Sequence, residues 1–199
     1  MRKNFSIVLI LVTLILGGCN NKKIEQLPIE PRELPKISSE DAETKITELS
    51  ENLKVQYDGM KKLTFYSCPI YLGRKVCVAP YVSVADDDYS VELFCHVVYS
   101  GHERIDFDTL YIKTAGEVKT FYFADVYRMY HAGYYGDEYN GVMPANLYYT
   151  LKKVIEVGSA RIRLEGIAYE ERNLLPAEIE QMRKVFSLYE FLSNVQVEQ

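Results

Sequence analysis

The chain has 199 residues, of which 48% are hydrophobic, 26% charged and 13% aromatic, and its formal net charge is −5 at pH 7. This composition is typical of a globular protein and excludes a mostly disordered, collagenous or polytopic membrane protein. The acidic balance argues against nucleic acid as a partner, because phosphate backbones are bound through basic surfaces.

The first eighteen residues predict export from the cell. Arg2 and Lys3 form a short basic start, and residues 5–16 carry no charge. This run is shorter than the roughly 20 apolar residues that span a bilayer, so it predicts a signal peptide over residues 1–18. Its end, Leu16-Gly17-Gly18-Cys19, resembles the lipobox of bacterial lipoproteins, in which an aliphatic residue and two small residues precede a cysteine.

The lipobox resemblance implies cleavage before Cys19 and attachment of a diacylglycerol to its thiol. Each buried acyl CH₂ contributes about 0.8 kcal/mol, so two or three acyl chains such as palmitate anchor a protein stably in a membrane. The expected location is the bacterial cell envelope. Because Asn20 stands where an Asp retains lipoproteins in the inner membrane, a Gram-negative host implies the outer membrane, and any other host the outer face of the cell membrane. The alternative is an ordinary signal peptide followed by a chance cysteine.

Residues 19–37 predict a lipidated N-terminus and a proline-rich tether. Pro28, Pro31 and Pro35 lie close together, at a density that neither a helix nor a central strand tolerates. An extended spacer at about 3.1 Å per residue would hold the following domain away from the bilayer. Residues 38–199 then predict a single globular domain, because this length suits one hydrophobic core.

Hydrophobic periodicity predicts a first helix over residues 39–61, beginning with a capping box at Ser38. Five segments rich in Val, Tyr, Phe and Thr, separated by turn residues, then predict strands: 63–71, 75–85, 90–99, 107–113 and 117–124. Short connections predict that neighbouring strands are antiparallel.

Residues 125–143 contain three glycines and predict a long loop. The remaining segments predict a helix over 144–156, a strand over 160–169 and a last helix from Pro176. The whole order predicts an α+β fold. It is an antiparallel sheet of about six strands, with the N-terminal helix and the two C-terminal helices packed mainly on one face.

The C-terminal strand and helix resemble the terminal unit of uncharacterised bacterial secreted and lipoprotein domains. The resemblance rests on the following residues: Arg161-Ile162-Arg163-Leu164-Glu165-Gly166, Tyr169, Leu174, Glu178, Met182, Val185, Phe186 and Tyr189. Tyr57-Asp58 also matches, whereas Leu175 departs from the Ser or Thr helix cap of that group. The resemblance implies the fold and an exported location, and it implies no activity.

Tyrosine is the most unusual component, with 17 residues against no tryptophan, and eight of them lie between positions 122 and 149. Four are candidate ligand-binding residues: Tyr130, Tyr134, Tyr135 and Tyr139. A tyrosine ring offers rigid apolar area with a polar tip, which suits the binding of proteins or sugar rings. The favoured interpretation is that these rings complete the rim of the core, and the alternative is a binding surface.

Motifs of catalysis and metal binding are not found in the sequence. The histidines His96, His102 and His131 lack helical zinc spacing, no serine lies in a G-x-S-x-G context, and no phosphate-binding glycine loop occurs. Arg161 and Arg163 share a strand face suited to an anion, but Glu165 on that face favours a solvated or salt-bridged row.

The sequence therefore predicts a non-enzymatic protein without cofactor or metal, with a binding or structural role at the cell envelope. Its expected partners are the membrane, through the lipid anchor, and an envelope protein or glycan. The first alternative is a glycan- or peptidoglycan-binding module that uses the tyrosine-rich loop. The second alternative is an envelope hydrolase, in which polar groups would converge in a deep pocket.

Cys68 and Cys77 predict a disulfide, because exported domains meet oxidising conditions. A two-residue turn at residues 72–73 would place these two cysteines directly opposite each other, whereas a turn one residue later would misalign them. Cys95 lies on an apolar strand face and predicts a buried thiol. Three unpaired thiols are the alternative.

Overall fold

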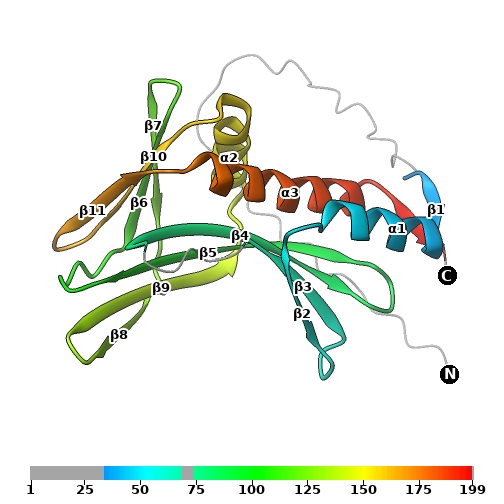
Figure 1. Ribbon diagram of the computed structural model, residues 1–199, viewed down its shortest axis with the longest axis horizontal. Helices are drawn as coiled ribbons and strands as arrows, with labels where there is room; N and C mark the ends of the chain where they lie inside the picture. The colour runs from blue at the N-terminus through cyan, green and yellow to red at the C-terminus, as the bar shows by residue number, and fades with distance from the viewer. Residues whose placement is uncertain (1–33, 69–73, 199) are drawn as a thin grey trace, which may run out of the picture. The chain divides into compact units, whose positions relative to one another are not determined.

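The computed structural model describes residues 34–68 and 74–198, and these residues adopt an α+β fold (Figure 1). The helices are α1 (Ser39–Leu49), α2 (Ala145–Val157) and α3 (Pro176–Ser193). The strands are β1 (Lys36–Ser38), β2 (Lys54–Asp58), β3 (Leu63–Ser67), β4 (Val76–Ala85), β5 (Val91–Gly101), β6 (Thr109–Thr114), β7 (Glu117–Tyr122), β8 (Tyr127–His131), β9 (Tyr134–Val142), β10 (Arg161–Glu165), β11 (Tyr169–Asn173) and β12 (Gln196–Glu198). Across these described ranges, no helix is both long and apolar enough to cross a membrane.

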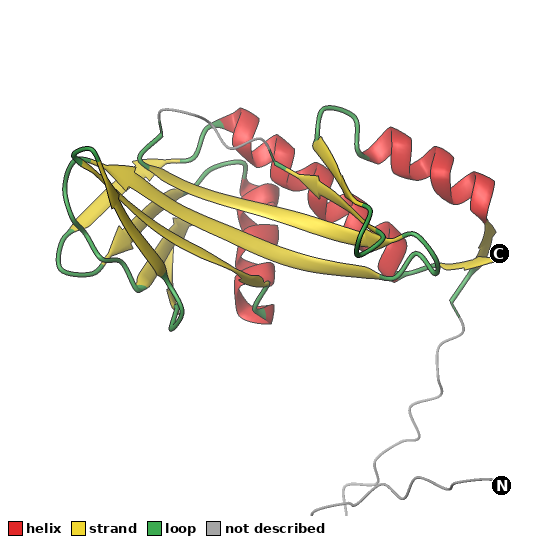
Figure 2. Ribbon diagram, turned by 90° about the horizontal axis from the view of Figure 1, so that it is seen from below, coloured by secondary structure: helices red, strands yellow, loops and turns green. Residues whose placement is uncertain are grey.

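The main sheet has six antiparallel strands in the order β2-β3-β4-β5-β9-β8. Its long central strands alternate, so that Leu93, Cys95, Val97 and Tyr99 of β5 are buried on one face. Helix α3 runs along the sheet with α1 beside it (Figure 1), and the view from below shows the strands in front of α3 (Figure 2). The predicted α+β class, with a six-stranded antiparallel sheet, an N-terminal helix and two C-terminal helices, is confirmed.

A second sheet has four antiparallel strands in the order β11-β10-β6-β7, and β1 and β12 form a short parallel pair. The inner face of the four-stranded sheet buries Leu110, Ile112, Ile162 and Leu164 completely. These side chains belong to one hydrophobic cluster that also includes the buried face of the main sheet and the inner sides of the helices. Both sheets therefore share a core.

The first predicted helix is too long. Helix α1 ends at Leu49, and the chain turns through Asn52, whose φ of 67° lies in the left-handed region. Residues 54–58 form β2, an edge strand that is almost entirely exposed. The helix was predicted too long because apolar residues continue at helical spacing beyond the turn. Val55 and Tyr57, which both favour strands, also alternate with polar residues as a strand requires.

The predicted loop over residues 125–143 is a β-hairpin. The predicted strand over 160–169 covers β10, the turn after it and only the first residue of β11, which continues to Asn173. The glycines of residues 125–143 predicted a loop, but Gly136 and Gly141 lie inside β9, beneath large side chains. A Cβ on Gly136 would lie 3.0 Å from Met129 Cγ, and one on Gly141 would lie 2.6 Å from the Tyr139 hydroxyl. Here glycine makes room for a ring or thioether instead of marking a loop.

The predicted opposition of Cys68 and Cys77 is wrong. Ser67 pairs with Tyr81, and the Cys68 amide donates to the Pro80 carbonyl at 3.5 Å, so that Cys68 lies beside residue 80. Cys77 pairs with Val98 on the other neighbouring strand. Among the described residues no disulfide joins the two cysteines, and the turn proposed at 72–73 lies outside the described ranges.

Burial raises the pKa of the Cys68 and Cys95 thiols, which keeps them in the protonated, unreactive form. We expect both to resist iodoacetamide in the native protein and to react after denaturation. Mass spectrometry of protein purified without reductant checks this. Rapid labelling of native Cys95 would contradict its burial, and failure to label Cys68 and Cys77 even after unfolding would restore the disulfide.

Candidate functional site

The hairpin of β8 and β9 forms one edge of the main sheet (Figure 1). Its turn residues, Ala132 and Gly133, have φ values of 49° and 86°, as a type I′ turn requires. This turn sets the register, with His131 opposite Tyr134 and Tyr130 opposite Tyr135. All five residues of β8 are exposed.

Among the described residues, no strand pairs with the outer edge of β8, which is the last strand of the main sheet. In a two-residue hairpin the residues next to the turn exchange hydrogen bonds, and bonded and non-bonded pairs then alternate. The bonded pairs are therefore those of His131 and Met129 with their β9 partners. The N–H and C=O groups of Arg128 and Tyr130 point away from β9, toward the free edge.

The two strands of the hairpin send the four candidate tyrosines to different faces of the sheet. Tyr130 and Tyr135 oppose each other on one face, with their ring centroids 4.9 Å apart. Tyr134 lies on the other face, where its ring contacts His102 at a centroid distance of 4.1 Å. The structure therefore does not bring the four rings together on one surface.

Burial divides the same tyrosines into two pairs. Tyr135 and Tyr139 are half-buried and pack against the core, and the Tyr139 ring stacks on Phe123 at 4.2 Å. Tyr130 and Tyr134 remain 66% and 51% exposed. Tyr135 and Tyr139 thus complete the rim of the core, as the favoured interpretation expected. Tyr130 and Tyr134 are exposed and therefore accessible to a partner.

Tyr127 and Met129 also belong to this exposed surface, although sequence reasoning did not single them out as site residues. They are 65% and 48% exposed and share a face with His131. The signal that identifies them is the alternation of residues along 127–131, which was missed because the segment was assigned to a loop.

A buried carboxylate fastens the hairpin to the segment before β6. Asp137 of β9 is 3% exposed, and its Oδ2 accepts the Phe107 amide at 3.0 Å. Arg128 Nη2 donates to the Phe107 carbonyl at 3.3 Å and to the Asp106 carbonyl at 3.4 Å. These bonds hold β8 in place without occupying its outer edge.

Burial raises the pKa of Asp137 above its ordinary value of 3.8, and the Phe107 hydrogen bond opposes this only in part. A carboxyl with a raised pKa contributes stability that is present below its unfolded pKa and lost as pH rises through its folded pKa. We expect Asp137→Asn, which keeps an acceptor for Phe107 but cannot ionise, to flatten the loss of stability above about pH 4. Urea denaturation across a pH series measures this.

Asp106→Asn is the matched control, because the pKa of Asp106 is shifted in the opposite direction to that of Asp137. Arg104 lowers the pKa of Asp106, so that this carboxylate contributes stability above its unfolded pKa that is lost as pH falls. The variant should therefore lose stability at neutral pH and become less sensitive to acid. Equal pH profiles for wild type and Asp137→Asn would contradict the role assigned to Asp137.

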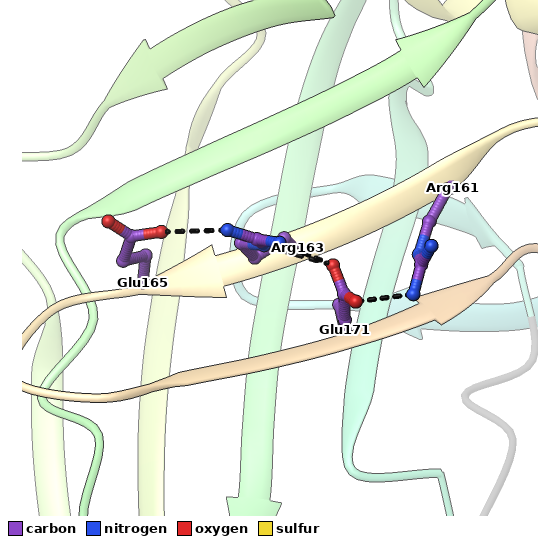
Figure 3. Close-up of polar contacts among 4 residues, drawn as sticks. All are labelled: Arg161, Arg163, Glu165 and Glu171. Carbon is purple, nitrogen blue, oxygen red and sulfur yellow. Dashed lines mark hydrogen bonds and ion pairs between the residues drawn. The ribbon is translucent and has the colours of Figure 1, made fainter.

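The outer face of the four-stranded sheet carries a second polar cluster (Figure 3). Arg163 Nη2 lies 2.8 Å from Glu171 Oε2 and its Nη1 lies 3.5 Å from Glu165 Oε2. Arg161 donates to the other oxygen of Glu171. Of the two alternatives that the sequence left open, a solvated or a salt-bridged row, the row is salt-bridged, and Glu171 of the neighbouring strand completes it.

Within the described ranges, no group of His, Cys, Asp and Glu side chains is arranged to hold a metal ion. Cys19, the predicted lipid attachment site, lies outside these ranges. No protein-family model matches the chain, and no curated protein or solved structure is significantly similar to it. The features of this chain that indicate a function are therefore the β8–β9 hairpin, the arginine cluster and the N-terminal motif.

Proposed function

We propose that the chain is a bacterial lipoprotein, anchored through Cys19, whose domain binds an extended segment of another envelope protein without catalysing a reaction. The lipobox Leu16-Gly17-Gly18-Cys19 supports the anchor. The observation that carries the binding role is β8, an exposed edge strand whose free backbone groups are flanked by aromatic and thioether side chains.

The proposed mode is β-strand addition, in which a partner segment pairs with the free edge of a sheet. Main-chain bonds to Arg128 and Tyr130 would supply affinity. Side chains alternating along the partner strand would meet Tyr127 and Met129 on one face and Tyr130 on the other. The partner segment is therefore expected to be extended, with apolar residues at alternate positions.

Edge strands normally carry features that block pairing, such as lysine, proline or a bulge. β8 contains neither lysine nor proline, and its arginine, Arg128, bonds to the Asp106 and Phe107 carbonyls. β2 at the opposite edge of the sheet, in contrast, begins with Lys54. A glycan platform made of the predicted tyrosines is less well supported, because the two exposed ones, Tyr130 and Tyr134, lie on opposite faces and cannot stack on one sugar surface.

Palmitate labelling in a bacterial host tests the anchor. The wild-type chain should incorporate labelled palmitate, and Cys19→Ala should abolish incorporation and leave the unprocessed precursor. Continued labelling of Cys19→Ala would contradict the lipoprotein assignment, but it would not bear on the proposed binding mode.

Site-specific photo-crosslinking in intact cells tests the binding mode. A benzophenone amino acid at position 129 should cross-link to an envelope protein, and the same probe at position 55 of the β2 edge should not. Tyr130→Pro should abolish the cross-link, because it removes an outward N–H while leaving the bonds of β8 to β9 intact. Tyr130→Ala is the matched control, since it removes the ring and keeps the N–H.

The outcomes separate three cases. Loss of the cross-link in Tyr130→Pro but retention of a weaker one in Tyr130→Ala supports strand addition. Equal cross-linking from positions 129 and 55 contradicts it. Cross-links only between copies of this chain replace the partner with self-association through β8.

A further inference from the structure

The outer face of the four-stranded sheet carries more positive charge than its own acidic side chains neutralise. Arg161 of β10 pairs directly with Lys113 of β6, and paired residues share a face. Like charges directly opposite each other destabilise a sheet. Arg163, two residues along β10, adds a third cation to this face.

The carboxylates on this face do not balance the three cations. Glu171 accepts from both Arg161 and Arg163, and Glu165 contacts Arg163 alone (Figure 3). Lys113 lies directly opposite Arg161 on the neighbouring strand. It makes no hydrogen bond or ion pair with any of the described side chains. An excess positive charge therefore remains between Lys113 and Arg161.

A pocket of about 300 Å³ lies at this position. Its walls include Tyr111, Lys113, Val118, Arg161, Arg163 and Glu171. This volume lies at the lower end of the range found for small-molecule sites, about 300–1,000 Å³. Tyr111 and Val118 add apolar surface beside the charged groups, so that the pocket offers both kinds of contact.

One side chain of the cationic wall, Arg163, is held in place before any ligand arrives. Arg163 Nε and Nη2 donate to Glu171 Oε2 at 3.0 Å and 2.8 Å. The Arg163 guanidinium also lies over the Tyr169 ring, 4.5 Å from its centroid. A side chain that is already ordered loses little conformational entropy on binding, which favours affinity.

We propose that this pocket binds a small organic anion. Its oxyanion group, a carboxylate or a phosphate, would lie between Lys113 and Arg161, and its apolar part would contact Tyr111 and Val118. Charge-assisted hydrogen bonds to ammonium and guanidinium groups are among the strongest polar contacts, and a bound anion would relieve the repulsion between the paired cations. This site is separate from the β8 edge and does not depend on the function proposed for it.

Calorimetric titration of the purified full-length chain at low ionic strength tests the proposal, with benzoate, phenyl phosphate, inorganic phosphate and neutral benzamide as probes. Benzoate or phenyl phosphate should bind, and benzamide should bind at least about tenfold more weakly. Tighter binding of phenyl phosphate than of benzoate assigns a phosphate, and the reverse order assigns a carboxylate. Inorganic phosphate reports the contribution of the oxyanion without the ring.

Lys113→Met should weaken binding of the favoured anion by at least about tenfold. The control is Lys119→Met on β7, because Lys119 pairs with Ile112 and so lies on the opposite face of the sheet. The control should bind like the wild type. Equal affinity of Lys113→Met and wild type, or equal binding of benzoate, phenyl phosphate and benzamide, would overturn the proposal.

Thermal unfolding in the absence of anions supplies a readout that does not require binding. If Lys113 and Arg161 repel each other in the empty pocket, Lys113→Met should raise the melting temperature of the free protein. The favoured anion should raise the melting temperature of the wild type more than that of this variant. A lower melting temperature for the anion-free variant would assign Lys113 a structural role and contradict the site.

Discussion

Replacing Arg172 by alanine is expected to lower the free energy of unfolding by about 3–5 kcal/mol, because the change leaves a buried carboxylate without its partner. Arg172 and Glu178 form a two-pronged ion pair, with N–O distances of 2.7 Å and 2.6 Å. Their side chains are only 15% and 5% exposed. Water would therefore compensate poorly for the lost guanidinium.

The same pair joins three elements. Arg172 of β11 donates through Nε to the Val76 carbonyl of β4 at 2.6 Å. Glu178 of α3 accepts the Leu175 amide at 2.7 Å, which satisfies a donor at the start of a helix whose cap residue has no side-chain acceptor. Loss of Arg172 should thus loosen the contact between the two sheets as well as the start of α3.

Equilibrium denaturation with urea measures the effect, and Arg161→Ala on the neighbouring strand is the control. Arg161 is 56% exposed in its own ion pair, and exposed pairs contribute about 0–1 kcal/mol. A double variant, Arg172→Met with Glu178→Met, should recover much of the lost stability by removing both charges. Equal losses for Arg172→Ala and Arg161→Ala would show that the buried pair has no special role.

Local signals predicted the two C-terminal helices well. The prediction placed a helix over 144–156 beginning at a proline, and α2 spans Ala145–Val157. Gly158 ends it with a φ of 73°, a left-handed conformation that glycine adopts without strain. Pro176 likewise begins α3. Proline at a helix start and glycine just after its end act within a few residues, so that no distant contact is needed to interpret them.

The division of the strands into two sheets was beyond sequence reasoning. β6, β7 and β10 were expected in the same sheet as β4 and β5, and each of them has the alternation of an ordinary half-buried strand. Which strands pair depends on contacts between residues far apart in the chain. Alternation specifies which side chains share a face, but it does not specify the neighbouring strand.

The candidate sites show the same limit. Assigning residues 125–143 to a loop removed the alternation that separates Tyr130 from Tyr134. For the second cluster, alternation did place Arg161, Arg163 and Glu165 on one face. Lys113 and Glu171 complete that cluster from neighbouring strands. Only the strand register brings these last two residues to the arginines.

Leu164→Ala is expected to lower the free energy of unfolding by about 2–5 kcal/mol, the range found when a buried leucine is truncated and leaves a cavity. Leu164 of β10 is completely buried opposite Leu110 of β6. Its cluster continues without a break to Val76 and Tyr99 of the main sheet. Because a shared core couples the elements that it joins, both sheets should weaken together in a single transition.

Hydrogen–deuterium exchange measures this coupling, since it reports the opening free energy of each strand separately. Amides of β4 and β5 should lose as much protection as those of β6 and β10 in Leu164→Ala. Ile167→Ala is the control, because that side chain is 70% exposed and its truncation leaves no cavity. If only β6 and β10 lost protection, the two sheets would be separate cooperative units, and the pocket on the outer face could open without disturbing the β8 edge.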